Sequence, residues 1–277
     1  MKTILVPTDF SKCSCNAINY ATALANKSNA KIILLHVYHV PVPSPETSLN
    51  PLTISEFHEV NIKRMKKMTD FELIINDKPP ILEIEYEAVA GFAVTEIIEA
   101  AKKHDAGLIV MGTQGASNLT EIIMGSITAH VIAKSTVPVL AVPLSAKYIG
   151  LNKIVLAADL HEIKNNSTLS PLLEIALLFD SEILIFSVLK SESDMPTAEQ
   201  TFEYLNLDKY LERVTHSLHT EVSHHIPDAI EKFALENHAD LLVTLPQKHN
   251  YLQLLFNKSS TRNLVFHSHT PLLSLPE

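Results

Sequence analysis

Short apolar runs alternate with longer amphipathic segments along the chain, a pattern typical of parallel strands separated by helices. In the first half, apolar runs predict strands near 3–8, 31–38, 82–88, 107–111 and 137–142. Segments with helical spacing predict helices near 13–27, 54–70, 93–104 and 126–135. Parallel sheets are covered on both faces and bind ligands at the carboxyl ends of their strands, so we expect a candidate site there.

The two halves of the chain repeat one another. Residues 4–9 recur as 154–159, and residues 106–143 align without a gap with 239–276. Eleven of those 38 positions are identical, which chance would rarely give without gaps. Each half therefore predicts a mostly parallel five-stranded sheet flanked by helices. The segment from Ser145 to Gly150 links the two expected domains, 1–146 and 151–277.

The repeat also predicts how the halves meet. Residues 137–142 and 270–275 are equivalent, and each predicts a terminal edge strand, with Pro138 and Pro271 near the strand starts. Exposed apolar edges favour pairing, so we expect these strands to pair antiparallel as an intramolecular pseudo-dimer. Homodimerisation of the whole chain through a separate surface stays open.

A glycine-containing segment follows the predicted strand 107–111. Gly112 and Gly115 are three residues apart, and nine residues separate Gly115 from Gly125, which precedes Ser126 and a helical pattern. Glycines allow tight turns and close approach of backbone, and a helix N-terminus carries free N–H groups and partial positive charge. This spacing predicts a phosphate-binding loop, although neither the Walker pattern nor G-x-G-x-x-G occurs.

Composition narrows the classes of partner. Of the 277 residues 46% are hydrophobic, which suffices for a packed core, and the net charge of −9 argues against nucleic acid. No apolar stretch reaches the roughly 18 residues of a membrane span, so we expect no membrane partner. The chain opens on a predicted strand rather than a signal peptide, and we expect a cytoplasmic protein. The basic cluster of Lys63, Arg64, Lys66 and Lys67 predicts a solvated helix face.

Cysteine and histidine suggest no metal centre. Cys13 and Cys15 fit small residues at a helix start better than a zinc or disulfide site, with redox sensitivity as a minor alternative. His36 is expected to be a hydrogen-bonded core residue, and His130 a surface residue. Nine of fourteen histidines lie in the second half, but no H-E-x-x-H spacing occurs, so we expect surface histidines. They include His216, His219, His224, His225, His267 and His269.

The segments ILVPTDFS, LLHVY at 34–38 and MGTQGASNLTEIIMGSITAHVIAKSTVPVLAVP at 111–143 resemble the universal stress protein family. The resemblance is to its ATP-binding branch, through the motif G-x2-G-x9-G-[ST]. The whole chain is similar to a tandem member of this family, which implies two Rossmann-like domains of the adenine nucleotide alpha hydrolase-like type. The match is specific in the first half and architectural in the second.

The resemblance implies a role for each matching residue. Asp9 would lie at the adenine or ribose end, Val37 would meet the base through its backbone, and the glycines with Ser126 would hold the phosphates. An acceptor such as Asp9 suits adenine N–H or ribose hydroxyl groups, whereas the hydroxyls of Ser126 and Thr128 can donate to phosphate. Asp9 and Ser126 could also cap helices. The implied site comprises Pro7, Thr8, Asp9, Val37, Met111, Gly112, Gly115, Gly125, Ser126, Ile127 and Thr128.

The second half departs from the motif. Leu245, Lys248 and Lys258 stand where the first half has its three glycines, while Asp159 and Ser259 persist. Side chains at these positions argue against nucleotide binding, because backbone must approach phosphate there. A smaller anion held by residues 258–262 is the alternative.

We therefore expect an ATP-binding, non-catalytic regulatory module with one competent site, with or without magnesium, that reports stress or energy state to an unidentified protein partner. No triad, paired carboxylates or Walker lysine and aspartate is visible. One alternative is a slow ATPase, for which His130 and Gln114 are the candidates to position water. The other is a scaffold with structural nucleotide, whose His-rich second half docks a partner or a small ligand.

Overall fold

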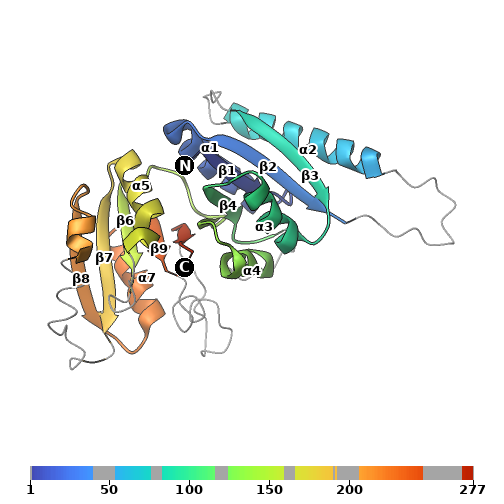
Figure 1. Ribbon diagram of the computed structural model, residues 1–277. Helices are drawn as coiled ribbons and strands as arrows, with labels where there is room; N and C mark the ends of the chain where they lie inside the picture. Colours follow the sequence, from blue (N-terminus) through green and yellow to red (C-terminus); the bar gives the residue numbers. More distant parts are fainter. Residues whose placement is uncertain are drawn as a thin grey trace.

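Figure 1 shows the computed structural model of the chain. The residues that it describes are 2–39, 54–75, 83–115, 124–158, 166–189, 191, 206–245 and 270–276. Several residues with predicted roles lie outside these ranges. They are Asp159, Lys248, residues 258–262, His267 and His269.

Helices and strands alternate through the first half as the apolar pattern predicts. Its elements are β1 (Thr3–Pro7), α1 (Lys12–Ser28), β2 (Lys31–Tyr38), α2 (Ile54–Ile75), β3 (Ile84–Ala90), α3 (Ala93–Lys103), β4 (Leu108–Gly112), α4 (Ser126–Lys134) and β5 (Val139–Val142). All nine predicted elements are present. The largest difference is at the end of α2, which extends five residues beyond the predicted end at 70.

The described part of the second half follows the same order. It contains β6 (Lys153–Ala157), the 3-10 helix η2 (Asn166–Leu169), α5 (Ser170–Phe179), β7 (Glu182–Leu189), β8 (His216–Val222), α7 (Ile226–Glu236), β9 (Leu241–Thr244) and β10 (Leu272–Ser274).

One ten-stranded sheet runs through both halves in the order β3-β2-β1-β4-β5-β10-β9-β6-β7-β8. Neighbouring strands are parallel within each half, which confirms the predicted α/β fold. The halves join where β5 and β10 pair antiparallel, with Leu140 opposite Leu273. This pairing of the two predicted edge strands reverses the strand direction, so the carboxyl ends of the two sets of strands face opposite edges of the sheet.

Helices cover both faces of this sheet (Figure 1). Buried side chains of α1, α2 and α5 pack on one face, and those of α3, α4 and α7 pack on the other. Alternation along β1 supplies both cores, because Ile4 and Val6 belong to the first and Leu5 to the second. The sheet thus forms the middle of three layers, and its carboxyl edges stay available for loops.

Equivalent hydrogen bonds recur in the two halves. Ile109 donates its backbone N–H to Pro138 at 2.9 Å, and Leu242 donates in the same way to Pro271 at 2.9 Å. Each proline directly precedes its strand, where the missing N–H is tolerated. The repeat seen in the sequence is therefore also a repeat in backbone geometry. Among the described residues, no helix has the length and apolar character needed to cross a membrane.

Candidate functional site

The chain leaves β1 through a tight turn at the carboxyl edge of the first half. The backbone N–H of Thr8 still donates to Leu35 of β2 at 2.8 Å. The N–H of Phe10 then donates to Thr8 Oγ1 at 3.1 Å, and the N–H of Ser11 to Asp9 Oδ1 at 3.0 Å. Ser11, rather than Asp9, caps α1 by accepting from the N–H of Ser14. Asp9 therefore orders the turn and leaves the capping role to Ser11.

Gly112 ends β4 against the start of α1. A Cβ at Gly112 would lie 2.8 Å from the carbonyl carbon of Cys13 and 2.9 Å from its Sγ. Only glycine allows this approach of two backbones. The two cysteines lie, as expected, near the start of α1, and Cys13 is buried against β4. The contact brings the glycine segment beside the turn that carries Asp9.

Gly115 brings the loop after β4 to the aspartate itself. A Cβ on Gly115 would lie 3.0 Å from Asp9 Oδ2, a contact tighter than most real Cβ atoms make. Asp9 is exposed, so its carboxylate lies beside Gly115 and is accessible to solvent. The structure thus places together two residues that are separated by more than a hundred positions in the sequence.

The loop returns to the same place at the start of α4. The N–H of Gly125 donates to Thr113 at 2.6 Å, and Thr128 Oγ1 donates to the carbonyl of Gly112 at 2.8 Å. Gly125 is the N-cap of α4 and Ser126 its first residue, so the alternative in which Ser126 caps this helix is wrong. The hydroxyl proton of Thr128 is engaged and buried, which differs from its expected donation to phosphate. Ser126 and Ile127 are exposed beside it.

The remaining predicted residues line the sheet side of this region. Pro7 is buried opposite Leu35, and Val37 extends two positions further along β2, where it pairs with Val89 of β3. Met111 is buried in the core beneath α3 and α4. The described residues of the implied set therefore gather at the ends of β1, β2 and β4 and at the N-terminus of α4.

His36 supports the turn from β2. Its Nδ1 lies 2.7 Å from the carbonyl oxygen of Thr8, which can only accept, so Nδ1 carries the proton. Burial lowers the pKa of His36, as does the positive charge of Arg64, although the Thr8 carbonyl and the charge of Asp9 favour the protonated ring. The prediction that His36 is a hydrogen-bonded residue is confirmed, with the ring half-buried rather than fully enclosed.

Two residues beside the turn have no expected role in the site. Phe10 adopts the left-handed conformation with φ of 63°, and its ring lies 4.4 Å from that of His36. Arg64 of α2 places its guanidinium 3.8 Å from the centre of the Phe10 ring. Arg64 is exposed, as predicted for the basic cluster to which it belongs. Arg64 and Phe10 are 54 positions apart, and no sequence pattern indicates their contact.

His130 and the first turn of α4 complete the described surroundings of the site. His130 is exposed, as predicted, and its Nδ1 lies 2.5 Å from the carbonyl of Ser126. Within the described ranges, no group of three or more His, Cys, Asp or Glu residues could hold a metal ion. Backbone N–H groups in the first turn of α4 lack partners within the helix and carry its positive end, which suits an anion.

In the second half, a buried side chain takes the place of the first glycine of the motif. Leu245 stands where the first half has Gly112, and it is buried in the core. Ala158 replaces Thr8 and donates its backbone N–H to Phe186 at 3.1 Å, as Thr8 does to Leu35. The backbone hydrogen bond at Ala158 is thus retained, while the hydroxyl of Thr8 and the glycine at position 112 have no counterpart.

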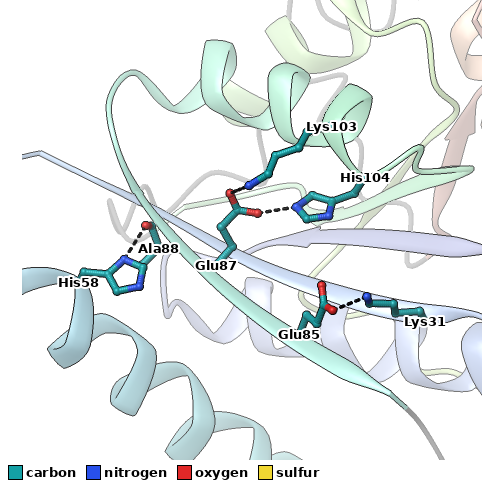
Figure 2. Close-up of polar contacts among 7 residues, drawn as sticks. All are labelled: Lys31, His58, Glu85, Glu87, Ala88, Lys103 and His104. Carbon is teal, nitrogen blue, oxygen red and sulfur yellow. Dashed lines mark hydrogen bonds and ion pairs between the residues drawn. The ribbon is translucent and has the colours of Figure 1, made fainter. Parts of the chain in front are cut away.

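A hollow of about 420 Å³ lies elsewhere, at the free edge of β3. Figure 2 shows polar side chains at this hollow and beside it: Glu87 points to Lys103 of α3 and to His104, the C-cap of that helix, and Glu85 pairs with Lys31 of β2. On the other face, His58 Nδ1 lies 3.0 Å from the carbonyl of Ala88 (Figure 2). The carboxylates of Glu85 and Glu87 are thus already paired with cations, so among the described residues this hollow presents no arrangement of groups suited to catalysis.

The universal stress protein family model matches residues 1–143, which is half of the chain. Universal stress protein MJ0531 of Methanocaldococcus jannaschii is 32% identical over 147 residues, covering 51% of this chain and 81% of the relative. YxiE of Bacillus subtilis is 30% identical over 143 residues, covering 50% of this chain and 97% of the relative. The chain belongs to the universal stress protein family, and it is roughly twice the size of a single domain of that family.

A solved structure shares the fold along the whole chain. A universal stress protein from Archaeoglobus fulgidus DSM 4304 matches with a TM-score of 0.69 at 20% identity. The match covers 99% of this chain and 96% of that one. A second, from Pseudomonas aeruginosa UCBPP-PA14, matches with a TM-score of 0.63 at 15% identity, covering 100% of this chain and 93% of that one.

Proposed function

We propose that the first half of this chain binds one molecule of ATP. The observation that carries the proposal is the convergence of Asp9, the segment from Gly112 to Gly115 and the N-terminus of α4 at the carboxyl edge of the sheet. Open sheets of this class bind ligands at this edge. Family membership supports a nucleotide as the ligand.

The residues present fit the two ends of a nucleotide. Free N–H groups at the start of α4, with Gly125 and the hydroxyl of Ser126, suit the phosphates. The exposed carboxylate of Asp9 can accept hydrogen bonds from ribose or adenine, with Val37 and Pro7 beside it. When bound, with or without magnesium, ATP would supply a charged ligand whose occupancy follows the energy state of the cell.

The proposal divides the chain into two domains, 1–146 and 151–277, of which only the first binds nucleotide. The buried side chain of Leu245 and the loss of the Thr8 hydroxyl at Ala158 support this difference. The second domain then serves as the partner for the first in an intramolecular pseudo-dimer. We further propose that the protein is cytoplasmic and that nucleotide occupancy controls its binding to a protein partner.

Calorimetry with ATP tests the proposed stoichiometry. We expect one ATP per full-length chain, and loss of binding in Gly125→Lys, whose side chain would occupy the approach to α4. Ala133→Lys is a matched control, because it adds the same charge at an exposed position near the other end of α4. Two equivalent sites, or unchanged affinity in Gly125→Lys, would contradict the proposal.

Phosphate release separates a regulatory module from an enzyme. We expect turnover of ATP with magnesium far below the median enzyme rate of about 10 per second, because none of the described residues around the site is placed as a general base. A rate near that median that is lost in Gly125→Lys would establish an ATPase instead. Partner binding that is unchanged by ATP would favour a scaffold with structural nucleotide.

A further inference from the structure

An aromatic and cationic stack lies against the turn that carries Asp9. The centres of the Phe10 and His36 rings are 4.4 Å apart, and the two ring planes are tilted by 50°. The guanidinium carbon of Arg64 lies 3.8 Å from the centre of the Phe10 ring. His36 comes from β2, whereas Arg64 comes from α2. Three elements that are separate in the sequence therefore meet at a single side chain.

The backbone at Phe10 needs outside support. Its φ of 63° lies in the left-handed region, which bulky residues rarely adopt because Cβ approaches the following carbonyl. Such conformations persist only where the surroundings hold them. The contacts to His36 and Arg64 act on the ring, and so they are positioned to hold this backbone angle.

The conformation of Phe10 determines where Asp9 points. The N–H of Phe10 donates to Thr8 Oγ1, and the N–H of Ser11 donates to Asp9 Oδ1, so both amides adjoining the strained residue are tied to the turn. Asp9 Oδ2 is the atom nearest to a Cβ placed on Gly115, at 3.0 Å. If Phe10 relaxed to a negative φ, these bonds would break and the carboxylate would leave the loop.

We propose that Arg64 is a positioning residue for the nucleotide site, acting through a cation–π contact that holds Phe10 left-handed and thereby aims Asp9. The inference rests on the proposed function in so far as it concerns ATP. It extends that function by making α2, which carries none of the motif residues, a contributor to affinity. The planar guanidinium matches the ring face, which the ammonium of lysine does not.

Calorimetry of the full chain measures the effect on ATP binding. An exposed cation–π contact corresponds to a factor of about two to five, so we expect Arg64→Ala to weaken ATP binding by that factor. Arg64→Lys should recover only part of the loss. Lys63→Ala removes the neighbouring charge on the same helix and should leave the affinity unchanged. Equal losses in Lys63→Ala and Arg64→Ala would overturn the proposal in favour of net charge.

Amide hydrogen exchange tests the stack without nucleotide. We expect the amides of Phe10 and Ser11 to exchange about two to five times faster in Arg64→Ala, with core amides of β1 unchanged. Phe10→Gly removes both ring and strain, so adding Arg64→Ala to it should have no further effect. Unchanged exchange in Arg64→Ala overturns the positioning role. If exchange is faster in Arg64→Ala but the wild-type protein binds no ATP, Arg64 still supports the turn and the proposed function is rejected.

Discussion

Gly112 and Gly125 each lie where two segments of backbone come together, so their role in packing precedes any role in binding. The tolerance for a Cβ differs between them: the nearest backbone atom would be 2.8 Å away at Gly112 and 3.2 Å away at Gly125. A motif glycine can therefore be required by the fold even without a ligand. The packing requirement for glycine is thus stricter at Gly112, before the loop, than at Gly125, after it.

We expect Gly112→Ala to lower the free energy of unfolding by about 1–3 kcal/mol, because the added methyl group would overlap the backbone of Cys13. Gly125→Ala should cost less, since Thr113 needs to move by only a few tenths of an ångström. Urea denaturation of both variants measures the difference. A larger loss at Gly125 than at Gly112 would contradict this account.

His36 should make stability depend on pH in a defined direction. Burial lowers its pKa in the folded protein below the ordinary value of 6.5, so the unfolded chain takes up a proton first as the pH falls. The contribution of His36 to the free energy of unfolding is thus fully present above pH 6.5 and is lost below it. Because the chain contains thirteen other histidines, the measurement is the difference between wild type and His36→Gln from pH 7.5 to pH 5. Parallel curves would refute it.

At the scale of elements, the C-terminal end of α3 is fastened to the edge strand β3. Glu87 accepts from Lys103 Nζ at 2.5 Å and lies 2.5 Å from His104 Nε2 (Figure 2). Burial opposes the charged carboxylate, but the hydrogen bonds and positive charges of Lys103 and His104 outweigh it and lower the pKa of Glu87. The pairing therefore stabilises the fold above the ordinary carboxyl pKa of 4.5 and is lost as the pH falls.

Replacement of Glu87 by glutamine should cost about 0.5–1 kcal/mol at pH 7, the range of a partly exposed ion pair. The cost should shrink between pH 7 and pH 3.5, because the native carboxylate takes up a proton and loses its charge as the pH falls through its lowered pKa. Glu99→Gln is the control, because its pair with Lys102 is more than half exposed on both sides and should contribute almost nothing. Thermal unfolding at the two pH values distinguishes the variants. An equal cost at both would exclude the ion pair as its cause.

Local patterns predicted the elements, because strand and helix periods depend on neighbouring residues. The positions of β1, β2, β4 and α4 followed from apolar runs and glycine spacing, and the motif then indicated the edge where Asp9 and Gly115 meet. The contact of Arg64 with Phe10 had no such signal. It depends on where α2 packs, and a left-handed phenylalanine violates local preference. Tertiary contacts of this kind cannot be inferred from periodicity.

At the scale of the whole molecule, the register of β5 and β10 can be tested directly. Leu140 and Leu273 are paired across the antiparallel ladder. In a chain with Cys13→Ala and Cys15→Ala, we expect Leu140→Cys with Leu273→Cys to form an intrachain disulfide on oxidation during refolding. Mass spectrometry after digestion identifies the linked peptides, and each single-cysteine variant is the control. Only interchain links would show that the strands pair between different chains.

Pairing within one chain changes the molecularity of assembly. Two separate single-domain chains that joined at β5 would do so only as far as their concentration allowed. Here the segment 143–152 joins the two halves, and a short linker corresponds to an effective concentration on the order of millimolar. The ladder therefore forms as a first-order event, and its occupancy does not change with the amount of protein in the cell.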